Sequence, residues 1–193
     1  STFEDLVAEM QVEPAKQTEL VTAYLDGSIA DADKTMAEKV IQIRNVAAII
    51  QKNRPDVLMM AEYNNDGTGK DKVALEGFQK NYLSVAQSLE GAGGTADLEP
   101  IEYPYTESYA TNTGLNSGLD LDNNGTAGQL PGDAWGFGFY HGQYAFALMS
   151  RYEIDTANTR TFQAFKWKDM EGAVTPTITI CDGSQTIPDG MKC

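Results

Sequence analysis

A short apolar run bounded by helix-breaking and turn-forming residues constrains the fold of this chain more than any other segment. Residues 57–60 (Val-Leu-Met-Met) follow Pro55 and precede Glu62 and the turn cluster at residues 64–67 (Asn-Asn-Asp-Gly). Proline ends a helix and the Asx/Gly cluster favours a turn, so the run is predicted to be a strand. Its apolar residues do not alternate with polar ones, so we expect burial on both faces. Glu62 would then lie at the end of a buried strand, where an unpaired charge is costly, and is a candidate metal ligand.

Helical periodicity dominates the chain before this strand. Apolar residues recur at spacings of three and four between residues 35 and 52, which predicts an amphipathic helix. Further helices are predicted at residues 2–9, 14–26 and 70–83. Strands are expected at residues 101–110, 134–140 and 144–150. This mixture predicts an α/β fold, and because nothing marks a linker we expect residues 1–193 to form a single domain.

The charge of the chain limits its partners. Asp and Glu number 28 against 14 Lys and Arg, which gives a formal net charge of −14. Such a chain is expected to repel the backbone of nucleic acids and anionic membranes and to attract cations. No segment approaches the roughly 20 apolar residues of a membrane span, so we expect no membrane partner.

The two cysteines, Cys181 and Cys193, lie in a polar stretch without the paired spacing of a zinc site. We interpret them as a disulfide, which would contribute about 3 kcal/mol in the chain-entropy model. Two unrelated thiols are the alternative. A disulfide would place the protein in an oxidising compartment, so we expect it to be secreted or periplasmic.

An acidic, glycine-containing loop suggests a second metal site. Asp120, Asp122 and Asn124 occupy every second position before Gly125, as in the first half of a calcium loop. An EF-hand would need Glu at position twelve, where this chain has Pro131. We therefore predict a Ca²⁺ site of another kind, completed by Asp133 or a backbone carbonyl. The alternative is an Asx-rich surface turn.

Several segments, in order from about residue 38 to about residue 172, resemble the endonuclease/exonuclease/phosphatase family, which has the DNase I-like fold. The first group is Arg44-Asn45-Val46-Ala47-Ala48-Ile49-Ile50-Gln51, Arg54-Pro55-Asp56-Val57 and Glu62-Tyr63. A second group resembles a secreted bacterial branch of the family: Asn112-Thr113-Gly114, residues 117–122 and 132–138, and Gly142-Gln143-Tyr144 leading to Ser150-Arg151-Tyr152.

The resemblance implies a two-sheet sandwich flanked by helices and hydrolysis of phosphate esters. It implies that Glu62 binds Mg²⁺ or Mn²⁺, which would polarise a phosphoryl oxygen. A capping or salt-bridged acid is the other interpretation of Glu62, and Asn64 and Asp66 are candidates for orienting it. The phosphate-contacting Tyr of related enzymes falls near His141, with Gln143 aligned and Tyr144 next to it, so these residues are candidate phosphate contacts.

Three elements of the family pattern have no clear counterpart here: an Asn on an N-terminal strand, an Asp-x-Asn at a later strand end, and a C-terminal Ser-Asp-His. Asp122-Asn123-Asn124 has the letters of Asp-x-Asn but follows no predicted strand. His141 is preceded by Phe139-Tyr140 instead of Ser-Asp, so it does not match the catalytic His of the family. The resemblance therefore covers the N-terminal half of the fold, and this chain alone lacks the expected catalytic His and Asp. Half a sandwich exposes an apolar sheet face, so we expect a missing C-terminal half or a partner subunit to cover it.

Trp135, Phe137 and Phe139 alternate with small residues, and we interpret them as the core side of a strand. The alternative is a platform for a sugar or base. Arg151 is expected to pair with an acid at a strand end.

Two functions follow from the sequence. The first is metal-dependent hydrolysis of small phosphate esters, with duplex DNA disfavoured by charge. The alternative is a non-catalytic, calcium-stabilised extracellular module that acts through protein contacts or assembly.

Overall fold

The structure, a computed structural model, describes residues 2–174. Cys181 and Cys193, and with them the predicted disulfide, lie outside these residues. The elements, in order, are α1 (Phe3–Met10), α2 (Pro14–Asp26), η1 (Asp31–Asp33), α3 (Lys34–Asn53), β1 (Val57–Ala61), α4 (Val73–Phe78), η2 (Gln79–Leu83), β2 (Tyr105–Ser108), β3 (Phe146–Ser150) and η3 (Trp167–Asp169). The fold is mixed α/β, as predicted.

The predicted helices before the first strand form close to their expected bounds. Thr2 and Asp5 make a reciprocal capping box at the start of α1, with hydrogen bonds of 3.1 and 2.8 Å. Arg54 ends α3 in a left-handed conformation with φ of 49°, directly before Pro55. The helix predicted at residues 70–83 is shorter, since α4 begins at Val73 and continues as the π-helical turn η2. Among the described residues, no helix combines the length and apolar character needed to cross a membrane.

The three strands form an antiparallel sheet in the order β1-β3-β2. β3 lies in the middle: Ala61 pairs with Phe146 at one end of the β1–β3 ladder and Val57 pairs with Ser150 at the other. β2 joins the other edge of β3, where Tyr105 also pairs with Ser150. Residues 2–174 contain this one sheet, so the second sheet of the expected sandwich stays a prediction.

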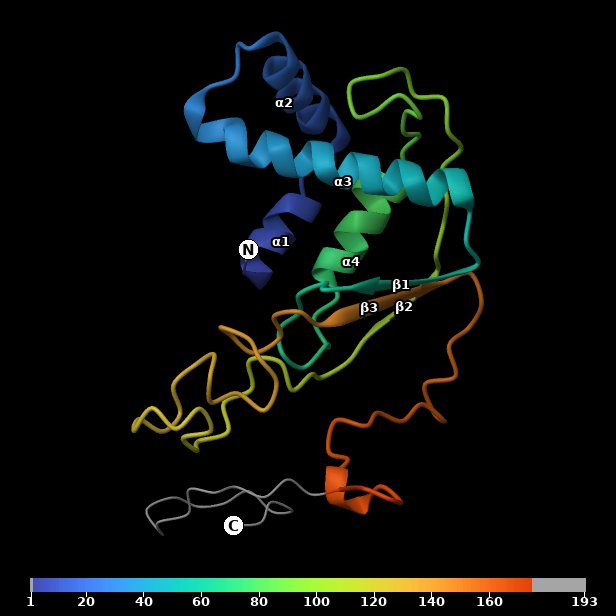
Figure 1. Ribbon diagram of the computed structural model, residues 1–193. Helices are drawn as coiled ribbons and strands as arrows, with labels where there is room; N and C mark the ends of the chain where they lie inside the picture. Colours follow the sequence, from blue (N-terminus) through green and yellow to red (C-terminus); the bar gives the residue numbers. More distant parts are fainter. Residues whose placement is uncertain (1, 175–193) are drawn as a thin grey trace.

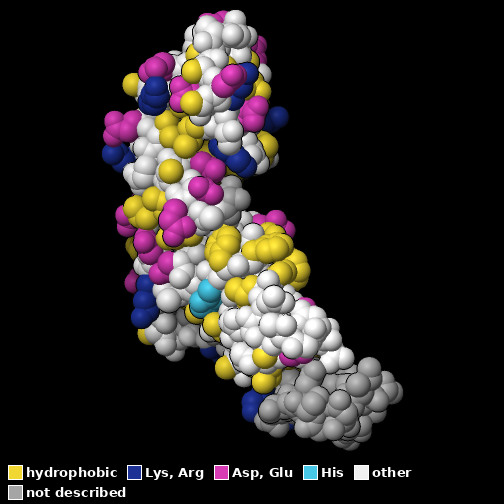
Figure 2. Space-filling view, turned by 90° about the vertical axis from the view of Figure 1, so that its left-hand side faces the viewer, with side chains coloured by type: hydrophobic (Ala, Val, Ile, Leu, Met, Phe, Trp, Pro, Cys, Tyr) yellow, Lys and Arg dark blue, Asp and Glu magenta, His cyan; other side chains and the backbone are white. Residues whose placement is uncertain are grey.

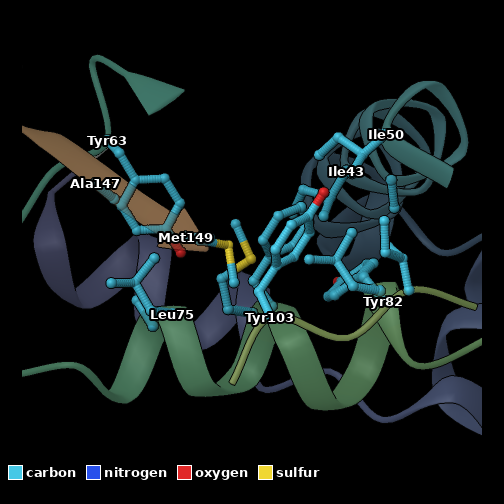
Figure 3. Close-up of a cluster of buried hydrophobic side chains, with 14 residues drawn as sticks. Ile43, Ile50, Tyr63, Leu75, Tyr82, Tyr103, Ala147 and Met149 are labelled. Carbon is cyan, nitrogen blue, oxygen red and sulfur yellow. The ribbon is translucent and has the colours of Figure 1, made fainter. Parts of the chain in front are cut away.

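The helices cover one face of the sheet (Figure 1). Leu58, Met60, Ala147 and Met149 face them and join one core cluster with side chains of α1, α3, α4 and η2. Figure 3 shows Tyr63, Leu75, Tyr82, Tyr103 and Met149 converging between the sheet and the helices. Their burial supplies the main stabilisation of this half of the molecule.

The opposite face of the sheet is open, which makes the prediction of a strand buried on both sides wrong. Val57 is 55% exposed and Met59 is 65% exposed, because alternate residues of β1 point away from the helices. Tyr105 and Phe146 are each 40% exposed on the same side of the neighbouring strands. We refer to this surface, formed by Val57, Met59, Tyr105 and Phe146, as the open face.

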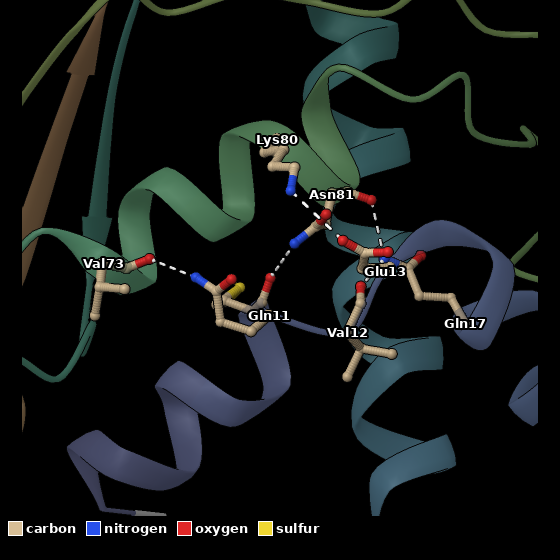
Figure 4. A network of polar contacts seen from close by, with 8 residues as sticks. Gln11, Val12, Glu13, Gln17, Val73, Lys80 and Asn81 are labelled. Carbon is tan, nitrogen blue, oxygen red and sulfur yellow. Dashed lines mark hydrogen bonds and ion pairs between the residues drawn. The ribbon is translucent and has the colours of Figure 1, made fainter.

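A network of amide side chains ties the N-terminal helices to α4 and η2 (Figure 4). Gln11 donates to the carbonyl of Val73 at 3.1 Å, and Asn81 donates to the carbonyl of Met10 at 2.9 Å. Gln17, which is 1% exposed, donates to the carbonyls of Val12 and Asn81. These hydrogen bonds, of which those between Gln17 and Asn81 and between Asn81 and Met10 are buried, hold α1 and α2 against α4 and η2.

The strand predicted at residues 134–140 does not form. The segment instead lies against residues 112–116 through isolated bridges, Thr113 with Gly136 and Asn116 with Ala134. A Cβ at Gly138 would lie 2.7 Å from the backbone N of Gly114, so the two backbones approach too closely for side chains between them.

The three alternating aromatics of this segment therefore point outward. Trp135, Phe137 and Phe139 are 52%, 61% and 60% exposed, and the interpretation as core residues is wrong. Hydrophobic side chains gather near the middle of the face shown in Figure 2.

Candidate functional site

Glu62 directly follows β1 and adopts a left-handed backbone conformation with φ of 57°. Its side chain is exposed, so the expected cost of a buried charge does not arise. It makes no side-chain hydrogen bond or ion pair with any residue between 2 and 174, so that part of the chain supports neither the capping nor the salt-bridge interpretation. The structure therefore presents a carboxylate that is open to a ligand.

A pocket of about 450 Å³ adjoins Glu62 on the helical side of the sheet. It lies between α1, α3 and the end of β1, and its lining residues are Leu6, Glu9, Met10, Lys39, Gln42, Ile43, Val46, Met60, Ala61, Glu62, Tyr63, Asn64 and Phe78. The polar lining thus combines two carboxylates, one ammonium group and two amides. Such convergent polar groups at the edge of an apolar pocket are typical of small-molecule sites.

The Tyr63 hydroxyl is buried and has no hydrogen-bond partner among the described residues. Burial, with a smaller contribution from the charge of Glu9 and then from Tyr82, raises the pKa of Tyr63 far above its usual range. The hydroxyl therefore stays protonated. Sequence reasoning missed Glu9, Lys39 and Tyr63, because tertiary packing of α1 and α3 against the sheet is what brings them together.

The loop after β1 continues to pair with the turn before β3. The backbone N–H of Tyr63 donates to the carbonyl of Ala145, and that of Asn65 donates to the carbonyl of Gly142, both at 3.0 Å. The side-chain oxygen of Asn64 accepts from the backbone N–H of Tyr144, also at 3.0 Å. The structure thus places Tyr144, a predicted phosphate contact, beside the loop that carries Glu62.

The other residues of this turn have defined partners. The Oε1 of Gln143 accepts from the backbone N–H of Phe139 at 2.7 Å, which holds the side chain across the turn. The Nε2 of His141 lies 2.9 Å from the carbonyl of Thr111. The His141 ring also packs against Gly67, where an added Cβ would lie 2.5 Å from Nδ1. These contacts show His141 holding the loop in place.

Asp66 caps its own turn. Its carboxylate accepts from Thr68 and Gly69 at distances between 2.7 and 3.0 Å. Partial burial acts to raise the pKa of Asp66, but these hydrogen bonds outweigh it and hold the pKa below its ordinary value. Asp66 therefore acts as an Asx-turn residue, and no contact to Glu62 is present.

The predicted acidic loop does bring three carboxylates together. Oxygens of Asp120, Asp122 and Asp133 lie within 4.8 Å of one another, so this cluster could bind a metal ion. The backbone N–H of Asn124 donates to both Asp120 and Asp122, at 3.0 and 3.1 Å. The side chain of Asn124 also contacts the cluster, because its amide nitrogen donates to Asp122 at 3.1 Å, while its oxygen, the predicted ligand atom, accepts from the backbone N–H of Thr126.

Asp133 is fully buried at the centre of this loop. Burial acts to raise its pKa, but backbone N–H groups of Gln129, Leu121, Asp122 and Gly128 donate to it and hold the pKa below its ordinary value. Asp133 therefore stays ionised and organises the loop. The same donors would also satisfy it in an Asx-rich turn without metal, so both interpretations fit the hydrogen bonds.

Comparison with known proteins identifies the family. No curated protein and no solved structure matches the chain significantly. The family model described as "Endonuclease/Exonuclease/phosphatase family" matches residues 33–188, a range that includes Glu62, the Gln143–Tyr144 turn and the three aspartates. This match covers most of the chain and confirms the resemblance to the family. The chain therefore belongs to the endonuclease/exonuclease/phosphatase family.

Proposed function

We propose that this protein is a metal-dependent hydrolase of phosphate esters in which Glu62 is a ligand of the divalent ion. Family membership supports phosphoester hydrolysis in general. The observation that carries the role of Glu62 is its exposed carboxylate, which has no side-chain partner in residues 2–174 and lines a pocket of about 450 Å³. Carboxylate oxygen is the ligand type that Mg²⁺ and Mn²⁺ prefer.

A bound divalent ion would supply Lewis-acid polarisation of a phosphoryl oxygen. The residues of the chain itself bind and orient the ester. The Tyr144 hydroxyl and the Gln143 amide N–H groups are donors suited to phosphate oxygens. The hydrogen bond from Tyr144 to Asn64 holds the turn that carries both beside Glu62.

Small phosphate esters are the proposed substrate class. The formal net charge of −14 opposes association with the polyanionic backbone of duplex DNA, while a small ester carries only one or two charges. A nucleic-acid substrate would require a basic groove to track its phosphates.

A structural Ca²⁺ ion at Asp120, Asp122 and Asp133 is a second part of the proposal. Its support is the mutual approach of the three carboxylates within 4.8 Å and the preference of Ca²⁺ for oxygen ligands. The ion would hold the loop against residues 112–116.

We also propose that Val57, Met59 and Tyr105 of the open face pack against a second sheet, from a further segment or from a partner subunit, whereas Phe146, at the end of β3, lies at the edge of this contact. Exposure of Val57 and Met59 supports this, because soluble proteins seldom leave contiguous apolar surface uncovered. The same exposure favours the alternative of a non-catalytic extracellular module that acts through protein contacts.

We propose that the protein is secreted or periplasmic, because Cys181 and Cys193 are interpreted as a disulfide. The mass of the non-reduced protein after thiol alkylation tests whether this disulfide is present.

Hydrolysis of p-nitrophenyl phosphate and bis-p-nitrophenyl phosphate with Mg²⁺ or Mn²⁺ tests the enzymatic proposal. We expect Glu62→Gln to lower kcat/KM about 100-fold or more and to weaken Mn²⁺ binding measured by electron paramagnetic resonance. Glu153→Gln is the matched control, because Glu153 is also exposed and follows the opposite end of the sheet. Wild-type protein without either activity, or a Glu62→Gln variant equal to the control, would favour the non-catalytic module.

A further inference from the structure

A second open pocket, of about 390 Å³, lies on the side of the sheet away from the helices. It forms where residues 109–112 and residues 159–163 meet Phe146 of the open face. Its lining residues are Tyr109, Ala110, Thr111, Asn112, Phe146, Thr159, Arg160, Thr161, Phe162 and Gln163. It shares no lining residue with the pocket beside Glu62.

The chemistry of this lining is unusual for so acidic a chain. Aromatic rings form the walls, with the centroids of Tyr109 and Phe146 6.0 Å apart. Three threonine hydroxyls and two side-chain amides add neutral polar groups, of which Thr159 already donates to the carbonyl of Asp155 and Asn112 to that of Gln163. Arg160 is the one charged group among the lining residues, and no carboxylate lines the pocket. In a protein with a net charge of −14, a pocket with a cation and no acid is suited to an anion.

Arg160 has its donors available. Its guanidinium carbon lies 5.6 Å from the centre of the Phe162 ring, a cation–π arrangement that positions the group. Phe162 is in turn held edge-on against Phe165, with ring centroids 6.0 Å apart. The guanidinium makes no hydrogen bond or ion pair within residues 2–174. The planar guanidinium therefore has N–H groups that can donate to two oxygens of a phosphate at once.

Hydrogen bonds fix the walls of the pocket relative to each other and to the Glu62 loop. Asn112 donates to the carbonyl of Gln163 at 2.8 Å, which joins the two segments that form the pocket. On the other side, Asn65 donates to the carbonyl of Tyr109 at 2.9 Å, and His141 contacts the carbonyl of Thr111. The pocket therefore shares its backbone framework with the loop that follows Glu62.

We propose that this pocket binds a phosphate group through the guanidinium of Arg160. The Thr161 hydroxyl supplies a neutral donor, and the aromatic walls contact any organic part of the ligand. The ligand is a free phosphate ion or the phosphate of a small ester, which present the same oxygens. Binding requires neither the metal nor hydrolysis, so this assignment stands or falls separately from the enzymatic proposal.

Titration of the metal-free protein, in the presence of a chelator, with inorganic phosphate and with phenyl phosphate tests the site. Isothermal calorimetry and ³¹P line broadening would measure affinities in the millimolar range. We expect Arg160→Gln to weaken binding about tenfold or more, and Arg160→Lys to restore only part of it, because an ammonium group lacks the planar fork. Phe162→Leu should weaken binding less, since it removes only the ring beneath the guanidinium.

Arg151→Gln is the matched control, because Arg151 is also exposed but pairs with Asp56 at 3.2 Å outside the pocket. It should bind phosphate like the wild type. Tighter binding of phenyl phosphate than of inorganic phosphate would identify an ester as the ligand, and the reverse would identify free phosphate. Absence of wild-type binding in the millimolar range, or an equal loss in Arg151→Gln and Arg160→Gln, would overturn the proposal. Because these residues are exposed, the variants should keep the wild-type circular dichroism spectrum.

Discussion

The side-chain oxygen of Asn64 accepts a hydrogen bond from the backbone N–H of Tyr144 at 3.0 Å, across 80 positions of sequence. The contact joins the loop after β1 to the turn before β3, where Tyr144 has a left-handed φ of 59°. It places a proposed phosphate contact beside the proposed metal ligand, Glu62. The geometry of the candidate site therefore depends on a neutral amide that carries no chemistry of its own.

Asn64→Ala should loosen this turn. We expect a loss of about 1 kcal/mol in the free energy of unfolding, the usual contribution of one hydrogen bond, and a higher KM for phosphate esters. Urea denaturation and steady-state kinetics measure the two effects. Asn45→Ala, at an exposed position of α3, should change neither by a comparable amount. Equal kinetics in wild type and Asn64→Ala would show that the turn does not contact substrate.

Gly67→Ala should destabilise the protein more than Gly27→Ala. Both glycines have positive φ, 84° and 79°, so each substitution strains the backbone by about 1 kcal/mol. A Cβ at Gly67 would also meet the His141 ring at 2.5 Å, whereas nothing lies within 4 Å of one at Gly27. The difference in unfolding free energy between the two variants isolates the packing of His141. Equal losses would contradict that contact.

Asp133 should make stability depend on pH at the acid end. Despite its burial, backbone donors hold the pKa of Asp133 below its ordinary value. A group of this kind stabilises the fold above its unfolded pKa, roughly 4, and the stabilisation is lost as the pH falls through the lower folded pKa. Urea unfolding below about pH 4 should therefore show a steeper loss of stability in the wild type than in Asp133→Asn. If the stability of the two proteins fell equally with pH, Asp133 would not contribute to the acid dependence of folding.

Calcium should raise the melting temperature if the three aspartates bind it. A ligand that binds only the folded protein stabilises it by about 2.7 kcal/mol at 100 times its dissociation constant. Differential scanning calorimetry with Ca²⁺ and with a chelator measures the shift. Asp122→Asn should abolish it, whereas Asp26→Asn, at the end of α2, should leave it intact. A wild-type melting temperature unaffected by Ca²⁺ would identify the loop as an Asx-rich turn.

Local signals in the sequence were sufficient to predict the helices before β1 and the position of β1 itself. Apolar spacing predicted α3 to within a residue at each end, because an amphipathic helix repeats its signal over several turns. Pro55 and the turn residues after Glu62 bounded β1. The sequence also indicated the acidic loop, since alternating oxygens before a glycine converge locally, and Asp133, one of the two completions considered, lies with Asp120 and Asp122.

The sequence predicted which side chains are exposed less well than it predicted the helices and β1. The apolar run at β1 predicted burial on both faces, yet Met59 is 65% exposed because the helices cover only the other side. The alternation of Phe137 with small residues predicts a core position, yet Phe137 is exposed because Gly138 brings the backbone against Gly114. Alternation along a chain shows which residues share a face, and only the packing partner decides which face is inside.

The sequence by itself therefore determined the family, the helices, the first strand and the loop that gathers three aspartates, because each depends on residues close together in the chain. Tertiary structure alone decided that β3 lies between β1 and β2, that Asn64 meets Tyr144, and that Arg160 faces a pocket without acids. These arrangements join residues far apart in sequence, and the free energy that selects them comes from long-range packing, which leaves no periodic trace in the local order of residues.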